Sequence, residues 1–330
     1  MKDKKTMGIT VLIAGLLALL PLILDTETSY FIYFLFLTFC YIILAQSWNL
    51  VAGYTGQVSL GHHAFFGLGA YTTAFIWTND ITGTGYYFDP VTMVLSGVIP
   101  AILAVLIGIP LLSKLRGDYF ALGTLGLGEI LRIIFVKGGS ITGGPVGIML
   151  PSSAFSSMKP YFYTGLFLCL ATVILTWLIV NSRFGLALVA IREDETAASA
   201  NGINILKYKI AVLATSAFFA GICGSLQAFY IFHVTPQGFL SLKWALYPIL
   251  MCVMGGSGTI VGPVIGAIFL TAVLTLSNIY LPNIHPIMTG FLIIIVMIYM
   301  PKGIVTLRFK RKNGIKNTSS KSGPVQTQLT

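Results

Sequence analysis

The chain has 330 residues, of which 56% are apolar and only 9% charged, and its mean hydropathy is +0.88. These values exclude an ordinary water-soluble domain. The net charge of +10 comes from 20 Lys and Arg against 10 Asp and Glu. Because the basic residues stand between apolar runs and not among interleaved aromatic residues, nucleic acid is not expected as a partner.

Apolar runs long enough to cross a bilayer follow one another along the chain. We predict an all-α, polytopic transmembrane helical bundle of about ten spans, with eight as the lower bound, in which some helices are broken or re-entrant. The predicted spans are residues 8–24, 30–51, 57–78, 91–112, 118–136, 161–181, 210–232, 244–258, 260–281 and 286–301. Glycines interrupt the pattern within 57–78 and between 244 and 281, where a broken helix fits equally well.

The basic residues predict the orientation of the bundle. When the loops are assigned to alternate sides, all but four of the 20 Lys and Arg fall on the side of the termini. The exceptions are Lys137, Lys159 and Lys243 on the opposite side and Arg132 within a span. The positive-inside rule therefore places both termini in the cytoplasm and the chain in the inner or plasma membrane. We expect one transmembrane domain over 1–305 and a disordered basic tail over 306–330 that meets membrane lipid.

Sequence motifs of catalysis and metal binding are absent. No GxxxxGK[ST] loop occurs, so the chain is not expected to bind ATP itself. His62 and His63 are adjacent, which is the wrong spacing for two metal ligands on one helix face. The four cysteines fall within predicted spans without a CxxC pair. We therefore expect no metal, no cofactor and no enzymatic activity.

The first stretch of glycine and polar residues at membrane depth is 49–71, NLVAGYTGQVSLGHHAFFGLGAY. A helix broken inside a membrane leaves backbone groups free, and they persist only where protein or a watery cavity satisfies them. The break can present half-helix N–H groups to a substrate carboxylate, and close helix packing through its glycines is an equally open interpretation. The candidate translocation-pathway residues here are Tyr54, Thr55, Gln57 and Ser59.

Glu129 and Arg132 lie three residues apart in the predicted span 118–136, so they share one helical face. A charge inside a membrane is costly unless it is paired or turned toward the interior of the bundle. The spacing predicts an intramembrane ion pair, and direct contact with substrate is the alternative.

The predicted external loop over 137–159 is long, nearly uncharged apart from its two terminal lysines, and rich in Gly, Ser and Pro. Loops of this length in compact proteins are usually functional or disordered. A functional loop here would be a re-entrant segment or a surface for a soluble partner. Its Thr142, Gly143 and Gly144 are further candidates for the translocation pathway.

The predicted cytoplasmic stretch 183–209 holds an acidic cluster at 193–195, then small residues, then Gly202. Acidic residues favour the amino end of a helix and glycine favours its end, so a short helix is expected. Small Ala197 and Ala198 would let this helix sit in a partner's groove. A solvated connector is the alternative.

Four motifs, in order along the chain, resemble one family. They are GQVSLGHHAFFGLGAY at 56–71, GDYFALGTLGLGEILR at 117–132, TGGPVGI at 142–148 and GGSGTIVGPVIGA at 255–267. Together they are similar to the branched-chain amino-acid permeases of ATP-binding-cassette (ABC) importers, and most of all to the LivM-type chain of the two paralogous subunits. The resemblance covers roughly residues 30–305.

The resemblance implies a role for the cytoplasmic stretch. Residues 190–206 are similar to the EAA loop by which ABC permeases dock their ATPases, with Glu-Thr-Ala-Ala in place of Glu-Ala-Ala. The implied docking residues are Glu195, Ala197, Ala198 and Gly202. The implied partners are a paralogous LivH-type permease chain, two ABC ATPase subunits, an external solute-binding protein and an amino-acid substrate.

We therefore expect the membrane-spanning subunit of an importer for branched-chain amino acids, working by alternating access with its paralogue. A urea or short-chain amide importer is the alternative within this class, because the selective step can belong to the binding protein. A self-contained ion-coupled carrier or channel is the alternative from another class, and it would leave the docking loop without a purpose.

Overall fold

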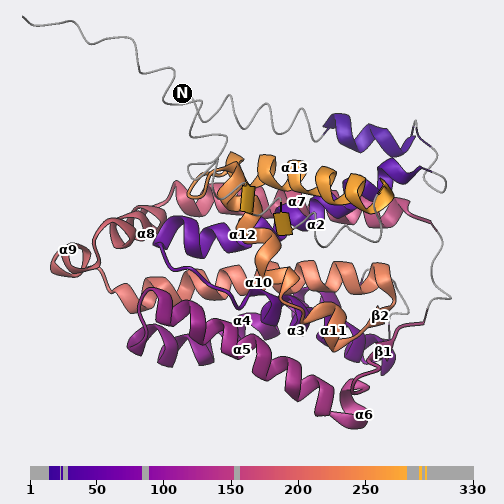
Figure 1. Cartoon of the computed structure of the whole chain (residues 1–330), viewed down its shortest axis with the longest axis horizontal. Helices are drawn as coiled ribbons and strands as arrows, with labels where there is room; N and C mark the ends of the chain where they lie inside the picture. Colours follow the sequence, from indigo (N-terminus) through magenta and orange to yellow (C-terminus); the bar gives the residue numbers. More distant parts are fainter. Residues whose placement is uncertain are drawn as a thin grey trace, which may run out of the picture.

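The computed structural model describes residues 15–22, 24, 29–83, 89–151, 157–280, 290–291 and 294–295, and this part of the chain is mostly helical (Figure 1). The elements in chain order are α2 (Tyr30–Trp48), the π-helical turn η1 (Asn49–Gly53), α3 (His62–Thr78), α4 (Pro90–Lys114), α5 (Asp118–Lys137), α6 (Gly139–Thr142), β1 (Ile148–Met149), α7 (Lys159–Val180), α8 (Arg183–Glu193), α9 (Glu195–Ala200), α10 (Ile205–Ile231), β2 (His233–Val234), α11 (Pro236–Phe239), α12 (Lys243–Gly255) and α13 (Val261–Tyr280).

Seven helical stretches in the described part of the chain are long and apolar enough to cross a membrane. They are Tyr30–Gly53, α4, α5, α7, α10, Pro236–Gly255 and α13. The predicted all-α membrane bundle is thus confirmed. Most of the predicted spans 8–24 and 286–301, both termini and the tail 306–330 lie outside the described residues. The number of ten crossings and the cytoplasmic termini therefore stay predictions.

The predicted span 57–78 needs a correction, because α3 begins only at His62. Gly56 has a φ of +71°, a left-handed conformation that suits glycine and ends the helical turn before it. Residues 57–61 are not helical, and the indole Nε1 of Trp48 donates to the Ser59 carbonyl at 2.8 Å. The helices α2 and α3 are thus joined by a partly buried, non-helical segment. The expected break is present, at its amino end.

Two two-residue strands form an antiparallel pair that the sequence did not predict. Ile148 of β1 lies opposite Val234 of β2, and the Leu150 N–H donates to the Phe232 carbonyl at 2.7 Å. Strands this short carry no alternating pattern by which they could be recognised. The pair joins the predicted external loop to the end of α10.

The long helix α10 lies at the centre of the bundle (Figure 1). On one side it contacts α3 and α4, and on the other it contacts α2 and α7. Backbones approach closely where α3 meets α10, because Gly69 faces Gly221 there. Small residues let membrane helices pack in this way, since apolar burial alone does not drive helices together in lipid. The glycines of α3 and α10 therefore build the core.

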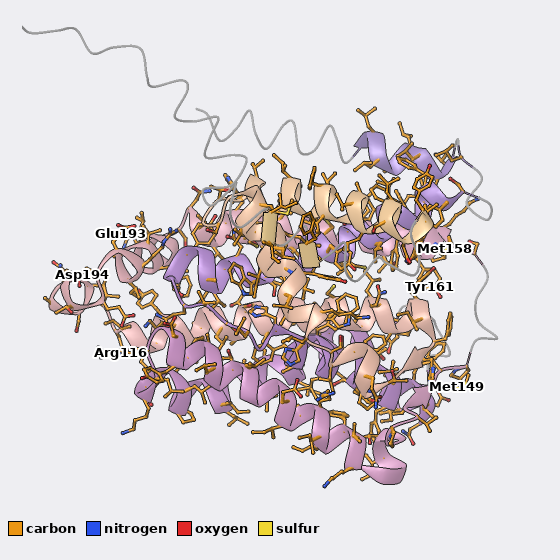
Figure 2. All side chains as sticks on the ribbon, in the orientation of Figure 1. Arg116, Met149, Met158, Tyr161, Glu193 and Asp194 are labelled. Atoms are coloured by element: carbon orange, nitrogen blue, oxygen red, sulfur yellow. The ribbon has the colours of Figure 1, made fainter. Side chains whose placement is uncertain are left out.

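The two ends of the bundle differ. The short helices α8 and α9 project at one end, and α6 with the β1–β2 pair lies at the other (Figure 1). Figure 2 shows Arg116, Glu193 and Asp194 at the first end and Met149 and Met158 at the second. The predicted cytoplasmic and external loops therefore lie at opposite ends of the helices, as alternating topology requires.

Candidate functional site

The projecting end is built from two short helices with side-chain caps. Ser182 caps α8, and the Asp194 carboxylate caps α9 by accepting from the N–H groups of Thr196 at 2.7 Å and Ala197 at 3.0 Å. Asp194 itself is extended, so it separates α8 from α9. Gly202 follows α9 with a φ of +82°. The expected acidic start and glycine end therefore belong to α9, a helix of six residues.

The four predicted docking residues do not share one surface. Ala197 and Gly202 are exposed, and a Cβ at Gly202 would meet no described atom within 4 Å. Ala198 is only 4% exposed, because the chain turns back after α9 and the Ile203 N–H donates to the Ala198 carbonyl. Ala198 is therefore not at the surface of this chain, and its part in docking stays a prediction. Its methyl group packs inside this chain.

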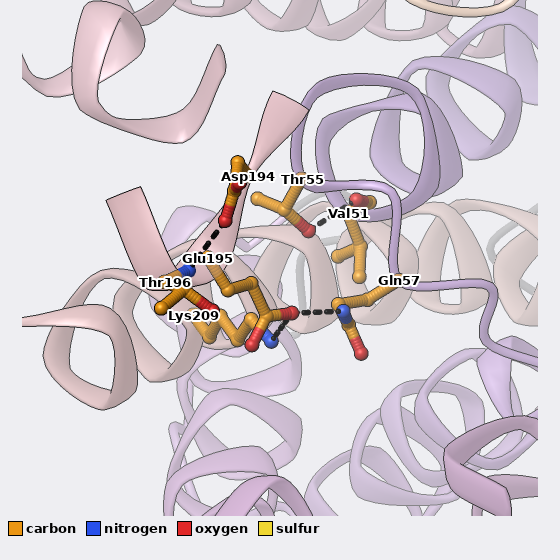
Figure 3. Close-up of polar contacts among 7 residues, drawn as sticks. All are labelled: Val51, Thr55, Gln57, Asp194, Glu195, Thr196 and Lys209. Atoms are coloured by element: carbon orange, nitrogen blue, oxygen red, sulfur yellow. Dashed lines mark hydrogen bonds and ion pairs between the residues drawn. The ribbon is translucent and has the colours of Figure 1, made fainter. Parts of the chain in front are cut away.

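Glu195 also points inward (Figure 3). Its Oε1 accepts from the ammonium of Lys209 at 2.5 Å and from Nε2 of Gln57 at 3.2 Å. Lys209, in the second turn of α10, is 4% exposed, and a buried ammonium is stable only with such a partner. Sequence reasoning missed Lys209. Its position just inside a long apolar helix was the available signal.

A second contact joins the projecting end to the break between α2 and α3. Nη1 of Arg192, in the last turn of α8, donates to the Gly53 carbonyl oxygen at 2.5 Å. Sequence reasoning missed Arg192 as well, because the two residues are 139 positions apart in the chain. The break and the docking segment, two separate candidates in the sequence, are therefore in direct contact.

Side chains of α2 and η1 hold the turn between α12 and α13 against the same break. The Asn49 amide donates to the Thr259 carbonyl at 2.9 Å and accepts from the Gly258 N–H at 2.8 Å. Nε2 of Gln46 donates to the Ile260 carbonyl at 2.6 Å. The family-like motif 255–267 thus meets the end of the α2–η1 helix, which directly precedes the motif 56–71.

The four candidate pathway residues at the break, Tyr54, Thr55, Gln57 and Ser59, are all buried. The Thr55 hydroxyl donates to the Val51 carbonyl at 2.6 Å, so it is used within its own turn. Within the described residues, Oε1 of Gln57, Nδ1 of His62 and Nε2 of His63 have no hydrogen-bond partner. Buried polar atoms are rarely left unpaired, which makes this segment a candidate for meeting a polar ligand.

The break also contacts α5. The Leu60 N–H donates to the Thr124 hydroxyl at 3.0 Å, and the His63 ring lies against Gly128. The next residue is Glu129, whose Oε2 lies 2.6 Å from Nη2 of Arg132. These side chains are 39% and 42% exposed, although α5 is apolar enough to span a membrane. The ion pair therefore lies on an open flank of the bundle.

The loop candidates lie apart from those at the break. The Thr142 hydroxyl donates to the Phe135 carbonyl at 2.6 Å, and Gly143 ends α6 in a left-handed conformation. Gln57 and Thr55 lie beside Glu195, at the projecting end (Figure 3), whereas α6 lies at the opposite end (Figure 1). The structure thus does not bring the two sets of candidates together. Thr142, Gly143 and Gly144 lie at the turn between α6 and β1.

Comparisons with known proteins agree with this architecture. Residues 30–301 match the family model described as "Branched-chain amino acid transport system / permease component". The chain is 32% identical to the high-affinity branched-chain amino acid transport system permease protein LivM of Escherichia coli K12, covering 84% of this chain and 71% of the relative. It is 26% identical to the probable LivM permease of Methanocaldococcus jannaschii, covering 80% of this chain and 90% of the relative. No solved structure matches this chain.

Proposed function

The chain belongs to the family of branched-chain amino acid transport permease components, and from that premise we propose that it is the membrane-spanning half of an ATP-driven importer for branched-chain amino acids. Its partners in this proposal are a paralogous permease chain, two ABC ATPase subunits and an external solute-binding protein. Residues 1–305 form the transmembrane domain, with about ten spans and both termini in the cytoplasm.

One observation carries the proposal: two capped short helices, α8 and α9, project from the end of the bundle that lies opposite the external turn. A helix that serves only as a connector needs no contact with the interior. Here Arg192 and Glu195 bind the break between α2 and α3. A partner that grips the exposed Ala197 face can therefore move the interior of the bundle, which is what alternating access requires.

The ion pair of Glu129 and Arg132 on α5 supports a pathway shared with a second permease chain. Half-exposed charges in a span are stable where water or another protein covers them, and unstable against hydrocarbon. The open flank with Glu129 and Arg132 therefore faces the paralogous chain or the water-filled pathway between the two halves. The buried ring of His63 lies behind this flank, against Gly128.

Reconstitution into liposomes tests the class of transporter. The complete assembly should accumulate radiolabelled leucine only when ATP is supplied on the side of the ATPase subunits and the binding protein is present. Flux through this chain alone would contradict the proposal and indicate a carrier or channel. Urea uptake measured in parallel decides the cargo, since uptake of urea without leucine would contradict the amino-acid assignment.

Docking is tested at the exposed face of α9. Ala197→Trp should abolish leucine uptake, because a large ring would block the partner's approach. In a pull-down, the ATPase subunits should no longer be retained by this variant. Ser113→Trp is the matched control, since Ser113 is exposed near Arg116 at the same end of the bundle. Equal uptake by both variants would contradict docking through α9.

A further inference from the structure

Arg192 occupies an unusual position for a basic residue near the surface. It belongs to the last turn of α8, yet its guanidinium reaches the Gly53 carbonyl at the end of the π-helical turn η1. The last carbonyls of a helix have no partner within the helix, and basic groups stabilise them through hydrogen bonds and the helix dipole. Arg192 therefore acts as a cap for the α2–η1 helix, supplied by a distant segment.

A third segment meets the same atoms. A Cβ added to Gly258, in the turn between α12 and α13, would lie 2.5 Å from Nη1 of Arg192 and 3.0 Å from the Gly53 oxygen. No side chain fits there, and the φ of +75° at Gly258 also favours glycine. Gly258 is itself fixed to Asn49 by a 2.8 Å hydrogen bond. The guanidinium of Arg192 thus contacts both the end of the α2–η1 helix and the turn between α12 and α13.

Glu195 makes the second attachment of the projecting end, and it differs in kind. Its main partner, Lys209, follows only 14 residues later, so this ion pair holds the α9–α10 connection together. Glu195 also reaches one distant residue, because its Oε1 accepts from Nε2 of Gln57 at 3.2 Å. Arg192 contacts two distant segments, and these belong to different helices of the bundle. If α8 and α9 moved with the Glu195–Lys209 pair intact, Arg192 would still move, together with the Gly53 carbonyl to which it donates.

We propose that Arg192 is a positioning residue that passes movement of α8 and α9 to the junction of Gly53 with Gly258. This inference rests on the proposed function, because it supposes that a partner moves α8 and α9. A guanidinium suits the task, since it stays charged and its planar donors keep a fixed direction. The buried pathway candidates follow Gly53 closely along the chain, and they are Tyr54, Thr55, Gln57 and Ser59. The Arg192 contact therefore links docking to the proposed pathway.

The test measures ATP hydrolysed per leucine imported by the complete assembly in liposomes, since loss of stability alone would lower both activities and leave their ratio unchanged. Arg192→Met should raise this ratio about tenfold, the size expected when one hydrogen bond to a charged group is lost. Arg183→Met is the matched control, at the other end of α8. It should leave the ratio at the wild-type value.

A double-variant cycle shows whether the contact itself matters. Gly258→Ala should disturb the ratio by pushing the guanidinium from the Gly53 oxygen, and adding Arg192→Met should then have little further effect, since both changes remove one contact. Arg192→Lys, which keeps the charge, should lie between wild type and Arg192→Met, and it serves as the test if Arg192→Met does not accumulate.

The outcomes separate the two proposals. A wild-type assembly without ATP-dependent leucine uptake would overturn the proposed function. A transporting wild type with a normal ratio in the Arg192 variants would overturn this inference alone. Loss of ATPase binding by Arg192→Met in a pull-down would also overturn it, because Arg192 would then be a docking contact. Additive effects of Arg192→Met and Gly258→Ala would contradict their shared contact.

Discussion

The helices α10 and α5 have the same mean hydropathy in their most apolar stretches and opposite surroundings. In α10, 72% of that stretch is buried, against 28% in α5. The glycines of α10 touch other backbones, because a Cβ at Gly224 would lie 2.0 Å from the Phe66 carbonyl oxygen. Gly126 of α5 has no described atom within 4 Å of the corresponding position.

This difference teaches what apolar composition leaves undecided in a membrane protein. Lipid is as apolar as a protein core, so hydropathy does not separate a central helix from a peripheral one. Glycine facing a neighbouring backbone marks the central helix. A half-exposed ion pair, such as Glu129 with Arg132, marks a peripheral face that something other than lipid covers.

The largest effect is expected from filling the core contact. Gly224→Val should prevent accumulation of folded protein, because the added carbon atoms would overlap the α3 backbone, which has no room to move. Size exclusion of a fluorescent fusion in mild detergent measures this as loss of the monodisperse peak. Gly126→Val is the matched control on α5 and should keep the peak. Loss of the peak in both variants would show that the two helices are equally constrained.

The next effect concerns the α5 pair. Glu129→Leu and Arg132→Leu should each lower leucine uptake about tenfold, because each leaves one charge unpaired within the membrane. The double variant should recover part of the uptake, since it removes both charges. Uptake is measured in liposomes with protein amounts matched by blotting. If the losses of the two single variants simply multiplied in the double variant, the pair would not act as a unit.

A smaller effect sharpens the assignment of the open side of α5. Gly126→Trp should leave the fold of this chain intact but weaken its association with the paralogous permease severalfold, because a bulky ring would hold the second chain away. Co-purification through a tag on the paralogue measures the association. Leu178→Trp, at an exposed apolar position of a different helix, α7, is the control. Equal association of both variants with the paralogue would place the second chain elsewhere.

Much of the fold could be predicted from the sequence, because charges such as Lys114 and Arg183 stand between long apolar runs. The break after α2 was also visible in glycine and polar residues. Its position was not, since the start of α3 at His62 depends on Gly56 and on a hydrogen bond from Trp48 across 11 residues. The β1–β2 pair depends on a tertiary contact and has no local pattern.

The candidate site was predicted in pieces. Glu195 was found through the resemblance to the docking loop, but its inward direction follows from the position of Lys209 on the next helix. Arg192 had no signal of its own, because its partner is a backbone carbonyl, and backbone atoms leave no trace in a sequence. Ala198 was expected at the surface since small residues suit both a docking face and a tight interior.

The smallest effect concerns how the two equally buried helices α4 and α5 begin. Asp89 is buried and caps α4 by accepting from the N–H groups of Val91 at 3.2 Å and Thr92 at 3.3 Å. Asp118 opens α5, which has no side-chain cap. Asp89→Ala should therefore lower stability by about 1 kcal/mol, and Asp118→Ala by less. Thermal unfolding in detergent, followed by size exclusion, measures both variants.

The pH dependence of the same cap distinguishes a hydrogen-bonded carboxylate from a packing effect. Burial raises the pKa of Asp89, but hydrogen bonds from Thr92 and Val91 outweigh it and hold the pKa below its ordinary value. A carboxylate with a depressed pKa contributes stability above the unfolded pKa of about 3.9 and loses it as pH falls through the folded pKa. The difference between wild type and Asp89→Ala should therefore be constant from neutral pH down to about pH 5 and shrink below about pH 4. A difference that persists unchanged at lower pH would mean that Asp89 stabilises α4 by packing, because protonation would then leave its contribution intact.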